Sequence, residues 1–414
     1  MDDVVNEAPG AAAPAAGGTV CAACGERAGD GARFCESCGA PLAAAAPAAE
    51  VTPTAAEVAP EVVAAEVAAE PAVGPSTADA PGTGPVPHPD ACPACGGEVA
   101  TDGYCTQCGA RAPVERDHRE EQPAPHVAGV SDVGVRRRRN EDALALGVVG
   151  DVSVLVVCDG VSSAPDSDVA SQAAATTARD VLVAGAADVG ADDAAGWSRL
   201  LVASGHRADA AAHAAVDDAT ARQDPPSCTF AAAVAGPTLL VAGWLGDSRV
   251  YWLPDAGTPE QLTEDDSVAA ELMAGGMSRA AAERSPDAHA ITRWLGADAG
   301  ETTARTVATR PSGPGWVLAC SDGLWNYASA PEVVADLLRE AVRRVGTDPL
   351  ALSRDLVAWA NARGGHDNVT AALARVTGPT AGDADAHEAD AGTAPTARRR
   401  PPGNLREQPV APAP

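Results

Sequence analysis

The sequence predicts an α+β fold over one long segment, residues 126–377, preceded by two short cysteine-rich modules. Three observations support this. Short apolar runs alternate with stretches of helical period along 126–377. Several consecutive strand-like runs are joined by two-residue turns such as Gly236-Pro237, which only antiparallel neighbours allow. Eight of the 11 cysteines form paired Cys-x2-Cys repeats ahead of this segment.

Composition excludes several classes of function. The chain has 414 residues, and its 29 basic residues, all arginine, face 57 acidic ones, for a net charge of −28. Without lysine there is no Walker-type phosphate loop, kinase lysine or Schiff-base lysine. The acidic balance argues against an extended nucleic-acid surface. No apolar run reaches the roughly 18 residues of a membrane span, and Met1-Asp2-Asp3 does not begin a signal peptide. We therefore expect a cytoplasmic protein with no membrane partner.

Abrupt changes in composition divide the chain. They predict a disordered start (1–20), a first cysteine module (21–42), an acidic Ala/Pro/Glu linker (43–88), a second module (89–112), a further linker (113–125) and a disordered tail (378–414). Only 126–377 is long enough to bury a sizeable core. Aromatic residues make up only 3 % of the chain, so alanine, valine and leucine must fill most of that core.

Each short module carries four cysteines in two close pairs. They are Cys21, Cys24, Cys35 and Cys38 in the first, and Cys92, Cys95, Cys105 and Cys108 in the second. Glycine follows the second and fourth cysteine of each set, which allows the tight turn that aims backbone amides at sulfur. Four thiolates suit tetrahedral Zn²⁺, and zinc supplies the folding free energy that about 20 residues lack. We predict two structural zinc ions.

Two other interpretations of these cysteines compete with zinc binding. Disulfides would require an oxidising compartment. Cys21 and Cys105 each precede an arginine by six positions, as in a cysteine-phosphatase loop, but neither lies between a strand and a helix. The module pair resembles the double zinc ribbons of bacterial regulatory proteins, which implies a regulatory or partner-binding role. The remaining cysteines, Cys158, Cys228 and Cys320, lie in apolar runs and are expected in the core.

Acidic residues recur at the ends of the predicted strands of 126–377. Asp159 follows 152–158, Asp247 follows 239–245, Asp322 follows 316–321, Asp367 precedes 369–373, and Glu141 and Asp142 precede 143–146. Any one Asp-Gly pair is more often a hairpin turn. Two carboxylates 4 Å apart repel by about 4 kcal/mol at an effective dielectric constant of 20, so a fold that gathers five such sites needs cations. Oxygen ligands favour Mg²⁺ or Mn²⁺ over Zn²⁺.

The same motifs, in order, resemble those of the metal-dependent protein phosphatases (PPM, or 2C-type). They are Val135–Asp142, Val157–Gly160, Gly246–Arg249, Cys320–Gly323 and Gly365–Thr370. The resemblance covers 130–376 and implies a four-layer α-β-β-α sandwich of two antiparallel sheets flanked by helices. We expect strands at 227–235, 238–245 and 248–253, successively antiparallel, and helices at 166–188, 196–221, 331–344 and 349–362.

The resemblance also implies a role for each site residue. In the family, the residue at Asp159 bridges two Mn²⁺ or Mg²⁺ ions, and the carbonyl at Gly160 is a further ligand. Asp322 and Asp367 would complete the shell of one ion, and Glu141 would contribute to the shell of the other, with Asp142 close by. Asp247 and Asp322 would hold a third ion, and Asn368 would support the ligands. Arg137 grips the substrate phosphate, since a planar guanidinium makes bidentate contact with phosphate. The implied reaction is hydrolysis of phosphoserine or phosphothreonine in proteins by a water activated at the binuclear centre.

Three positions depart from the family pattern. Val161 stands where some relatives carry a histidine proposed as a proton donor, Asn326 where many carry an aspartate, and Asp266 where a histidine is frequent. None removes a ligand of the two-metal centre, so we predict an active enzyme. Residues 263–298 match the flap beside the family's site. His206 and His213 are expected on a solvated helix face.

Two further interpretations stay open. The first is a phosphatase-like scaffold that binds a phosphoprotein or other signalling partner without turnover, although Asp159, Asp322 and Asp367 are all retained. The second makes the ribbons a nucleic-acid module, and the arginine run 136–139 read alone is a basic patch. The prediction that we favour is an enzyme with phosphoprotein substrates and a protein partner for its ribbons.

Overall fold

The structure is a computed structural model that describes residues 19–20, 27–28, 91–101, 103–161, 166–216, 225–285 and 287–378. The chain divides into two compact units, Met1–Ala112 and Pro113–Pro414. In the first unit β1 (Thr19–Val20) pairs with β2 (Arg27–Ala28). The ligands predicted for the first ribbon, Cys21, Cys24, Cys35 and Cys38, lie outside the described residues, as do the predicted acidic linker and nearly all of the start and tail that were predicted to be disordered.

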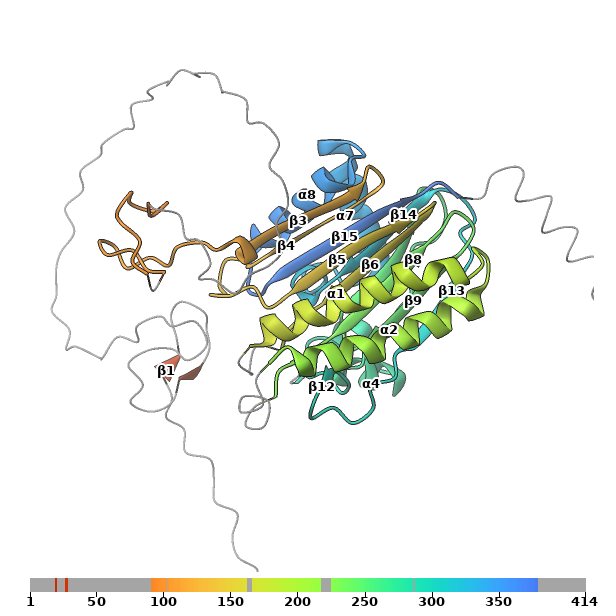
Figure 1. The fold of residues 1–414 in the computed structure, drawn as a ribbon, viewed down its shortest axis with the longest axis horizontal. Helices are drawn as coiled ribbons and strands as arrows, with labels where there is room; N and C mark the ends of the chain where they lie inside the picture. The colour runs from red at the N-terminus through yellow and green to blue at the C-terminus, as the bar shows by residue number, and fades with distance from the viewer. Residues whose placement is uncertain are drawn as a thin grey trace, which may run out of the picture. The chain divides into compact units, whose positions relative to one another are not determined.

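Two antiparallel sheets form the centre of the second unit (Figure 1). The six-stranded sheet has the order β11-β10-β14-β15-β4-β3, with β3 (His118–Ala124), β4 (Val127–Asp132), β10 (Arg249–Pro254), β11 (Glu260–Gln261), β14 (Gly315–Cys320) and β15 (Val369–Val376). The five-stranded sheet has the order β13-β9-β8-β6-β5, with β5 (Ala143–Val149), β6 (Val152–Cys158), β8 (Phe230–Ala235), β9 (Leu240–Leu245) and β13 (Arg305–Thr309). A separate short pair joins β7 (Ser227–Cys228) to β12 (Leu295–Gly296).

Helices cover the outer face of each sheet (Figure 1). α1 (Ser167–Gly185), which runs on into η2 (Ala186–Asp188), and α2 (Ala194–Ala214) pack on the five-stranded sheet. α7 (Pro331–Val345) and α8 (Pro349–Asn361) pack on the six-stranded sheet. The described residues also form the short helices η1 (Glu115–Asp117), α4 (Val268–Ala274), α5 (Arg279–Ala282) and α6 (Asp322–Trp325). The predicted four-layer α-β-β-α sandwich is confirmed.

The central strands are apolar throughout because both of their faces are buried. In β6, Val154 and Val156 face the α1–α2 layer, while Leu155 and Val157 face the other sheet. This period of two explains why the sequence shows an uninterrupted apolar run. Cys158, Cys228 and Cys320 are buried, as predicted. None of the described helices is both long and apolar enough to cross a membrane.

Helix boundaries follow local capping chemistry. The Asp193 side chain accepts a hydrogen bond from the Gly196 amide at the start of α2, and Asp348 does the same for Ala351 at the start of α8. α2 ends at Ala214, so the helix predicted to reach residue 221 is too long. His206 and His213 on α2 are exposed, as predicted.

The prediction that 238–245 and 248–253 are antiparallel neighbours is wrong. β9 pairs with β8 and β13, whereas β10, which follows after three residues, pairs with β11 and β14 in the other sheet. Gly246 adopts φ +95, a conformation that favours glycine, and this bend moves the chain from one layer to the other. A short connection therefore did not imply a hairpin here.

The prediction that 113–125 is a linker is also wrong. Residues 118–124 form β3, which pairs with β4 at the edge of the six-stranded sheet. Its sequence is charged and contains Pro123, as is common in edge strands, because an edge has to resist pairing with other chains. Glu120 of β3 is held to α8 by an ion pair with Arg354 at 2.5 Å.

Candidate metal and phosphate site

Segments from both sheets meet at one end of the sandwich. Asp159 follows β6, Asp247 follows β9, Asp322 follows β14, and Asp367 precedes β15 by two residues. Together they line a cavity of about 220 Å³ with Arg137, Gly160, Val161, Thr229, His289 and Ile291. The structure thus brings together six of the predicted site residues: Arg137, Asp159, Gly160, Asp247, Asp322 and Asp367.

The two Asp-Gly pairs are close-approach points and not hairpin turns. A Cβ atom at Gly160 would lie 2.7 Å from the Glu141 carbonyl oxygen. A Cβ atom at Gly323 would lie 1.9 Å from the Asn368 carbonyl oxygen. Only glycine lets these backbones come so close. The glycines therefore let the acidic residues before them approach the other segments of the site.

Thr229 connects Asp159 to the segment between β9 and β10, where the chain passes from one sheet to the other. Its hydroxyl accepts a hydrogen bond from the Asp159 amide at 2.9 Å, and its own amide donates to the Asp159 carbonyl at 2.8 Å. The same hydroxyl lies 2.7 Å from that of Ser248, the neighbour of Asp247. Thr229 was missed by sequence reasoning, which predicted one strand over 227–235, whereas the structure breaks it at this residue into β7 and β8.

Asn368 holds the loop that carries Arg137 and Glu141. Its side-chain amide donates to the carbonyls of Val133 and Arg139, each at 2.9 Å, and its carbonyl accepts from the Glu141 amide at 2.8 Å. Asn368 is 3 % exposed, so all three bonds are shielded from water. Its side chain therefore acts on the site through the backbone of that loop.

Glu141 and Asp142 are buried but do not belong to the lining of the cavity. One oxygen of Asp142 accepts hydrogen bonds from the hydroxyls of Ser321 and Thr370, each at 2.7 Å. The other oxygen, Oδ1, is buried and has no hydrogen-bond partner among the described residues. Such a group is costly unless something else compensates it.

The gathered carboxylates disfavour one another's charged forms. Burial, and then the charges of Asp142, Asp322, Asp367 and Asp247, raise the pKa of Asp159 well above its usual range. Burial likewise raises the pKa of Asp322 far above its usual range. Burial raises the pKa of Asp142 to about 6, and burial with the Asp265 charge raises that of Asp247 to about 7. A bound cation would reverse this electrostatic cost.

Arg137 supplies the positive charge in the cavity. Its guanidinium lies 2.6 Å from the carboxylate of Asp367. Arg139 in the same run pairs with Asp168 at 2.9 Å. Because these two arginines face carboxylates, the run 136–139 is not a continuous basic patch for nucleic acid.

The flap, residues 263–298, supplies two lining residues that sequence reasoning missed, His289 and Ile291. The departures noted in the sequence have structural partners: Asp266 accepts from the Gly246 amide at 3.0 Å and pairs with Arg305 at 2.7 Å. The Asn326 side chain donates to the Asp322 carboxylate at 3.0 Å.

A buried ion pair fastens the base of the flap behind the site. Arg249, 1 % exposed, pairs with Asp265 at 2.7 Å, and its guanidinium carbon lies 3.6 Å from the ring centroid of Trp325. The Trp325 indole in turn donates to the Asp247 carbonyl at 2.9 Å. The sequence placed Arg249 in a motif but did not indicate this role.

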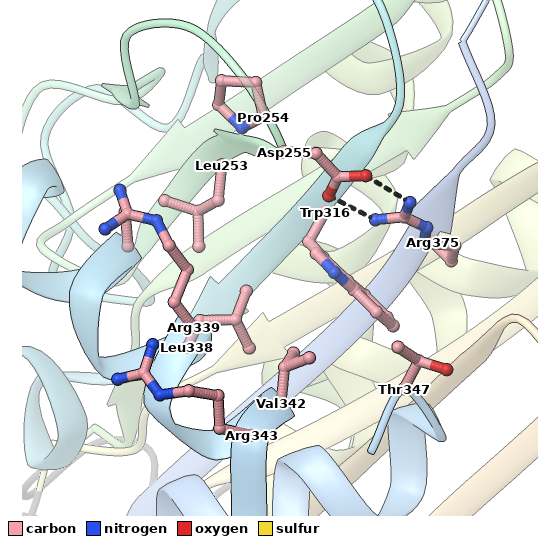
Figure 2. A pocket seen from close by; sticks show the side chains of 11 residues that line it. Leu253, Pro254, Asp255, Trp316, Leu338, Arg339, Val342, Arg343, Thr347 and Arg375 are labelled. Atoms are coloured by element: carbon pink, nitrogen blue, oxygen red, sulfur yellow. Dashed lines mark hydrogen bonds and ion pairs between the residues drawn. The ribbon is translucent and has the colours of Figure 1, made fainter.

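A larger cavity of about 530 Å³ lies at the opposite ends of β10 and β14, against α7 (Figure 2). Trp316, Leu253, Leu338 and Val342 line it, and Arg375 makes two hydrogen bonds to Asp255 at 2.7 and 2.5 Å. Its single carboxylate is therefore already paired. The cavity at the other end is smaller, but it is the one that gathers several carboxylates.

The second ribbon forms a separate thiolate site in the first unit. The sulfurs of Cys92, Cys95, Cys105 and Cys108 all lie within 4.8 Å of one another, the only such group of potential metal ligands among the described residues. Gly96 and Gly109 adopt φ +74 and +70, as the tight turns require. The backbone amides of Cys108 and Gln107, which face its sulfur, lower the pKa of Cys105 to about 6. This donor set fits Zn²⁺.

The sandwich with its cluster of acidic strand ends is of the kind found in metal-dependent phosphatases, and comparison of the sequence agrees. Residues 135–361, more than half of the chain, match the protein phosphatase 2C family, and the chain belongs to that family. Residues 21–109 match the double zinc ribbon family.

Individual relatives agree with this assignment. The serine/threonine phosphatase stp of Listeria welshimeri is 28% identical over 251 residues, which cover 60% of this chain and 94% of that protein. Human protein phosphatase 1F is 34% identical over 152 residues, 34% of this chain and 33% of that one. A solved bacterial serine phosphatase superposes with a TM-score of 0.53 at 22% identity, covering 62% of this chain and 100% of its own. At that identity the likeness concerns the fold.

Proposed function

We propose that this protein hydrolyses phosphoserine and phosphothreonine in proteins at a metal centre formed by its carboxylates. One observation carries the proposal: Arg137 and four aspartates from separate segments line a single cavity of about 220 Å³. A guanidinium beside clustered carboxylates matches a phosphate dianion that is bound together with divalent cations. The Listeria relatives, named as serine/threonine phosphatases, support the substrate class.

The residues present fit Mn²⁺ or Mg²⁺. We assign Asp159, Gly160, Asp322 and Asp367 to two ions, Asp247 with Asp322 to a third, and Glu141 and Asp142 to the buried side of the centre. The fit is supported by the all-oxygen donor set, by the raised pKa of Asp159 and by the unpartnered Oδ1 of Asp142. When bound, such ions neutralise the carboxylates and supply a water activated for attack on phosphorus.

The chain's own residues bind and position the substrate. Arg137 holds the phosphate oxygens, and Asp367 keeps its guanidinium turned into the cavity until substrate arrives. Asn368 fixes the backbone that carries Arg137 and Glu141, and Thr229 fixes Asp159. These contacts give the pre-organisation that an in-line displacement needs.

We further propose that both ribbons hold structural zinc, Cys92, Cys95, Cys105 and Cys108 in one and Cys21, Cys24, Cys35 and Cys38 in the other. In this proposal they form a partner-binding module between 21 and 112, ahead of a catalytic domain that ends near residue 377. The cytoplasm suits them, because its thiols stay reduced.

The test is turnover of a phosphoserine peptide by the full chain with saturating Mn²⁺, compared with Asp159→Asn. We expect release of phosphate by the wild type and a loss of at least about 10³-fold in the variant. Asp151→Asn is the matched control, because Asp151 is exposed at the opposite end of the same strand, β6, and should keep full activity. Binding of phosphopeptide without turnover by the wild type would instead support the scaffold interpretation.

A further inference from the structure

One flap residue, His289, faces the carboxylate cavity but has no part in the function proposed so far. It lines that cavity together with Arg137 and Asp322, and it also lines a neighbouring cavity of about 290 Å³. Its imidazole packs on Trp325 with 5.9 Å between the ring centroids. The residue is exposed, so it can exchange protons with solvent.

The backbone around His289 is anchored. The amides of Val268 and Ala269, at the start of α4, donate to the carbonyls of Ala290 and Ala288 at 3.0 and 3.1 Å. The Thr292 amide donates to the Asp266 carbonyl at 2.8 Å. The backbone that carries His289 is therefore held in place by hydrogen bonds to the start of α4 and to Asp266.

Trp325, the ring on which His289 packs, is itself tied to the site. Its indole nitrogen donates to the Asp247 carbonyl, and the guanidinium carbon of Arg249 lies over its ring, 3.6 Å from the ring centroid. The position of the imidazole is thus coupled to the segment that carries Asp247. This geometry is suited to delivering a proton at a defined place.

Hydrolysis of an alkyl phosphate needs a proton at the leaving oxygen, because a seryl or threonyl alkoxide is strongly basic. Val161 and Ile291 carry no acidic proton, and Arg137 stays charged at all relevant pH values. The aspartates of the cavity are assigned to the ions. Imidazole is the side chain that gains and loses a proton near neutral pH, and His289 is the histidine among the lining residues.

We propose that His289 donates the proton to the leaving oxygen of phosphoserine or phosphothreonine, an inference that rests on the proposed phosphatase function. The bond between phosphorus and the seryl oxygen breaks, its electron pair stays on that oxygen, and the imidazolium N–H proton completes the serine hydroxyl. The water oxygen forms the new bond to phosphorus, and the proton that this water loses returns to the imidazole through solvent. The charged groups that share the two cavities with His289 are Arg137, Asp159, Asp247, Asp322, Asp367, Glu283 and Arg284.

Two substrates separate this role from a structural one. 4-Nitrophenyl phosphate releases a phenolate that leaves without protonation, whereas a phosphoserine peptide does not. For His289→Ala and His289→Gln in the full Mn²⁺-loaded chain, we expect kcat to fall about 100-fold on the peptide and less than about threefold on the aryl ester. Mn²⁺ affinity, measured by calorimetry, should stay unchanged.

Each other outcome has a defined meaning. Equal losses on both substrates, or no loss on either, would overturn the role of His289. A wild type inactive on both substrates would overturn the proposed function itself, so the two failures are distinguishable. His206→Ala, which removes an exposed histidine of α2, is the matched control and should leave both rates unchanged.

Discussion

The thiolate site and the carboxylate site gather metal-ligating side chains in opposite ways. The four sulfurs of the second ribbon come from residues 92–108 and meet through two tight turns. The carboxylates come from residues 159–367 and meet only because two sheets pack with their strand ends together. One site is local in sequence, and the other is a product of the whole fold.

The two regions also differ in what stabilises them. The described part of the ribbon buries few apolar side chains, among them Cys92, Cys105 and Ala112. The second unit has extensive apolar clusters between its sheets and under its helices. We infer that the ion makes the ribbon fold, whereas the phosphatase unit folds by itself and is left with mutually repelling carboxylates that ions relieve.

The largest expected effect is the loss of the ribbon when zinc is removed. Zinc supplies about 10–16 kcal/mol in small fingers at pH 7, so a thiol-competing chelator should abolish amide-exchange protection across 92–108. All seven tryptophans lie at residue 197 or later, so their fluorescence reports the phosphatase unit alone. The Tm of the phosphatase unit should not change on adding the chelator. Amide-exchange protection that survives the chelator would show that the ribbon folds without zinc and would contradict the contrast between the two regions.

The next effect sets activity against stability at Asp322. Asp322→Asn should lower peptide turnover at least about 10³-fold, since a proposed ligand of two ions is lost. In metal-free protein the same change should raise Tm by a few degrees, because burial and the charges of Asp367, Asp247 and Asp142 disfavour the ionised carboxylate. Asp151→Asn serves as control in both assays. A lowered metal-free Tm would show that the carboxylate stabilises the fold.

A third effect is the pH dependence of the metal-free protein. Burial raises the pKa of Asp142 to about 6 and that of Asp247 to about 7, so the folded state keeps protons that the unfolded chain loses near pH 4. Stability from these groups is therefore present at low pH and is lost as pH rises to about 7. Glu120, whose pKa Arg354 lowers to about 2, is ionised in both the folded and the unfolded state above pH 5, so it does not contribute to this pH dependence.

Tm followed by tryptophan fluorescence should therefore be roughly 5–10 °C lower at pH 8 than at pH 5 without Mn²⁺. Added Mn²⁺ should raise Tm more at pH 8, because ions bind the charged carboxylates. A metal-free Tm that is equal at the two pH values would argue against a cluster of repelling charges.

The smallest effect concerns the side chain that holds the site loop. Asn368→Ala removes three buried hydrogen bonds and should cost about 2–3 kcal/mol of unfolding free energy. Activity should fall about tenfold, since the backbone of Glu141 and Arg137 is released. The matched control, Asn361→Ala, removes one hydrogen bond to Asp132 and should cost less than about 1 kcal/mol. Similar costs for both variants would contradict the special role of Asn368.

Much of the fold was predictable because it is encoded in short windows. The run 152–158 is apolar enough to identify β6, and the prolines at 331 and 349 mark the starts of α7 and α8. β3 was missed because an edge strand needs no apolar pattern. The pairing of β10 was mispredicted because a three-residue connection does not encode whether the chain turns back or crosses to the other layer.

The residues of the candidate site also differ in whether a short stretch of sequence identifies them. Asp159, Asp322 and Asp367 were predicted because each adjoins a recognisable strand. Thr229 and His289 were not, because a lone threonine or histidine carries no local signal, and only packing shows what it faces.

The sequence by itself determined the chemistry of both sites, since residue type and spacing choose thiolate or carboxylate and place each beside its turn or strand. Only the tertiary structure decided which carboxylates share a cavity and which sheet β10 joins. It also placed a histidine of the flap, His289, in the lining of the carboxylate cavity. Those outcomes depend on contacts between segments far apart in sequence, such as Arg137 with Asp367, which are 230 residues apart, and no short window of sequence contains them.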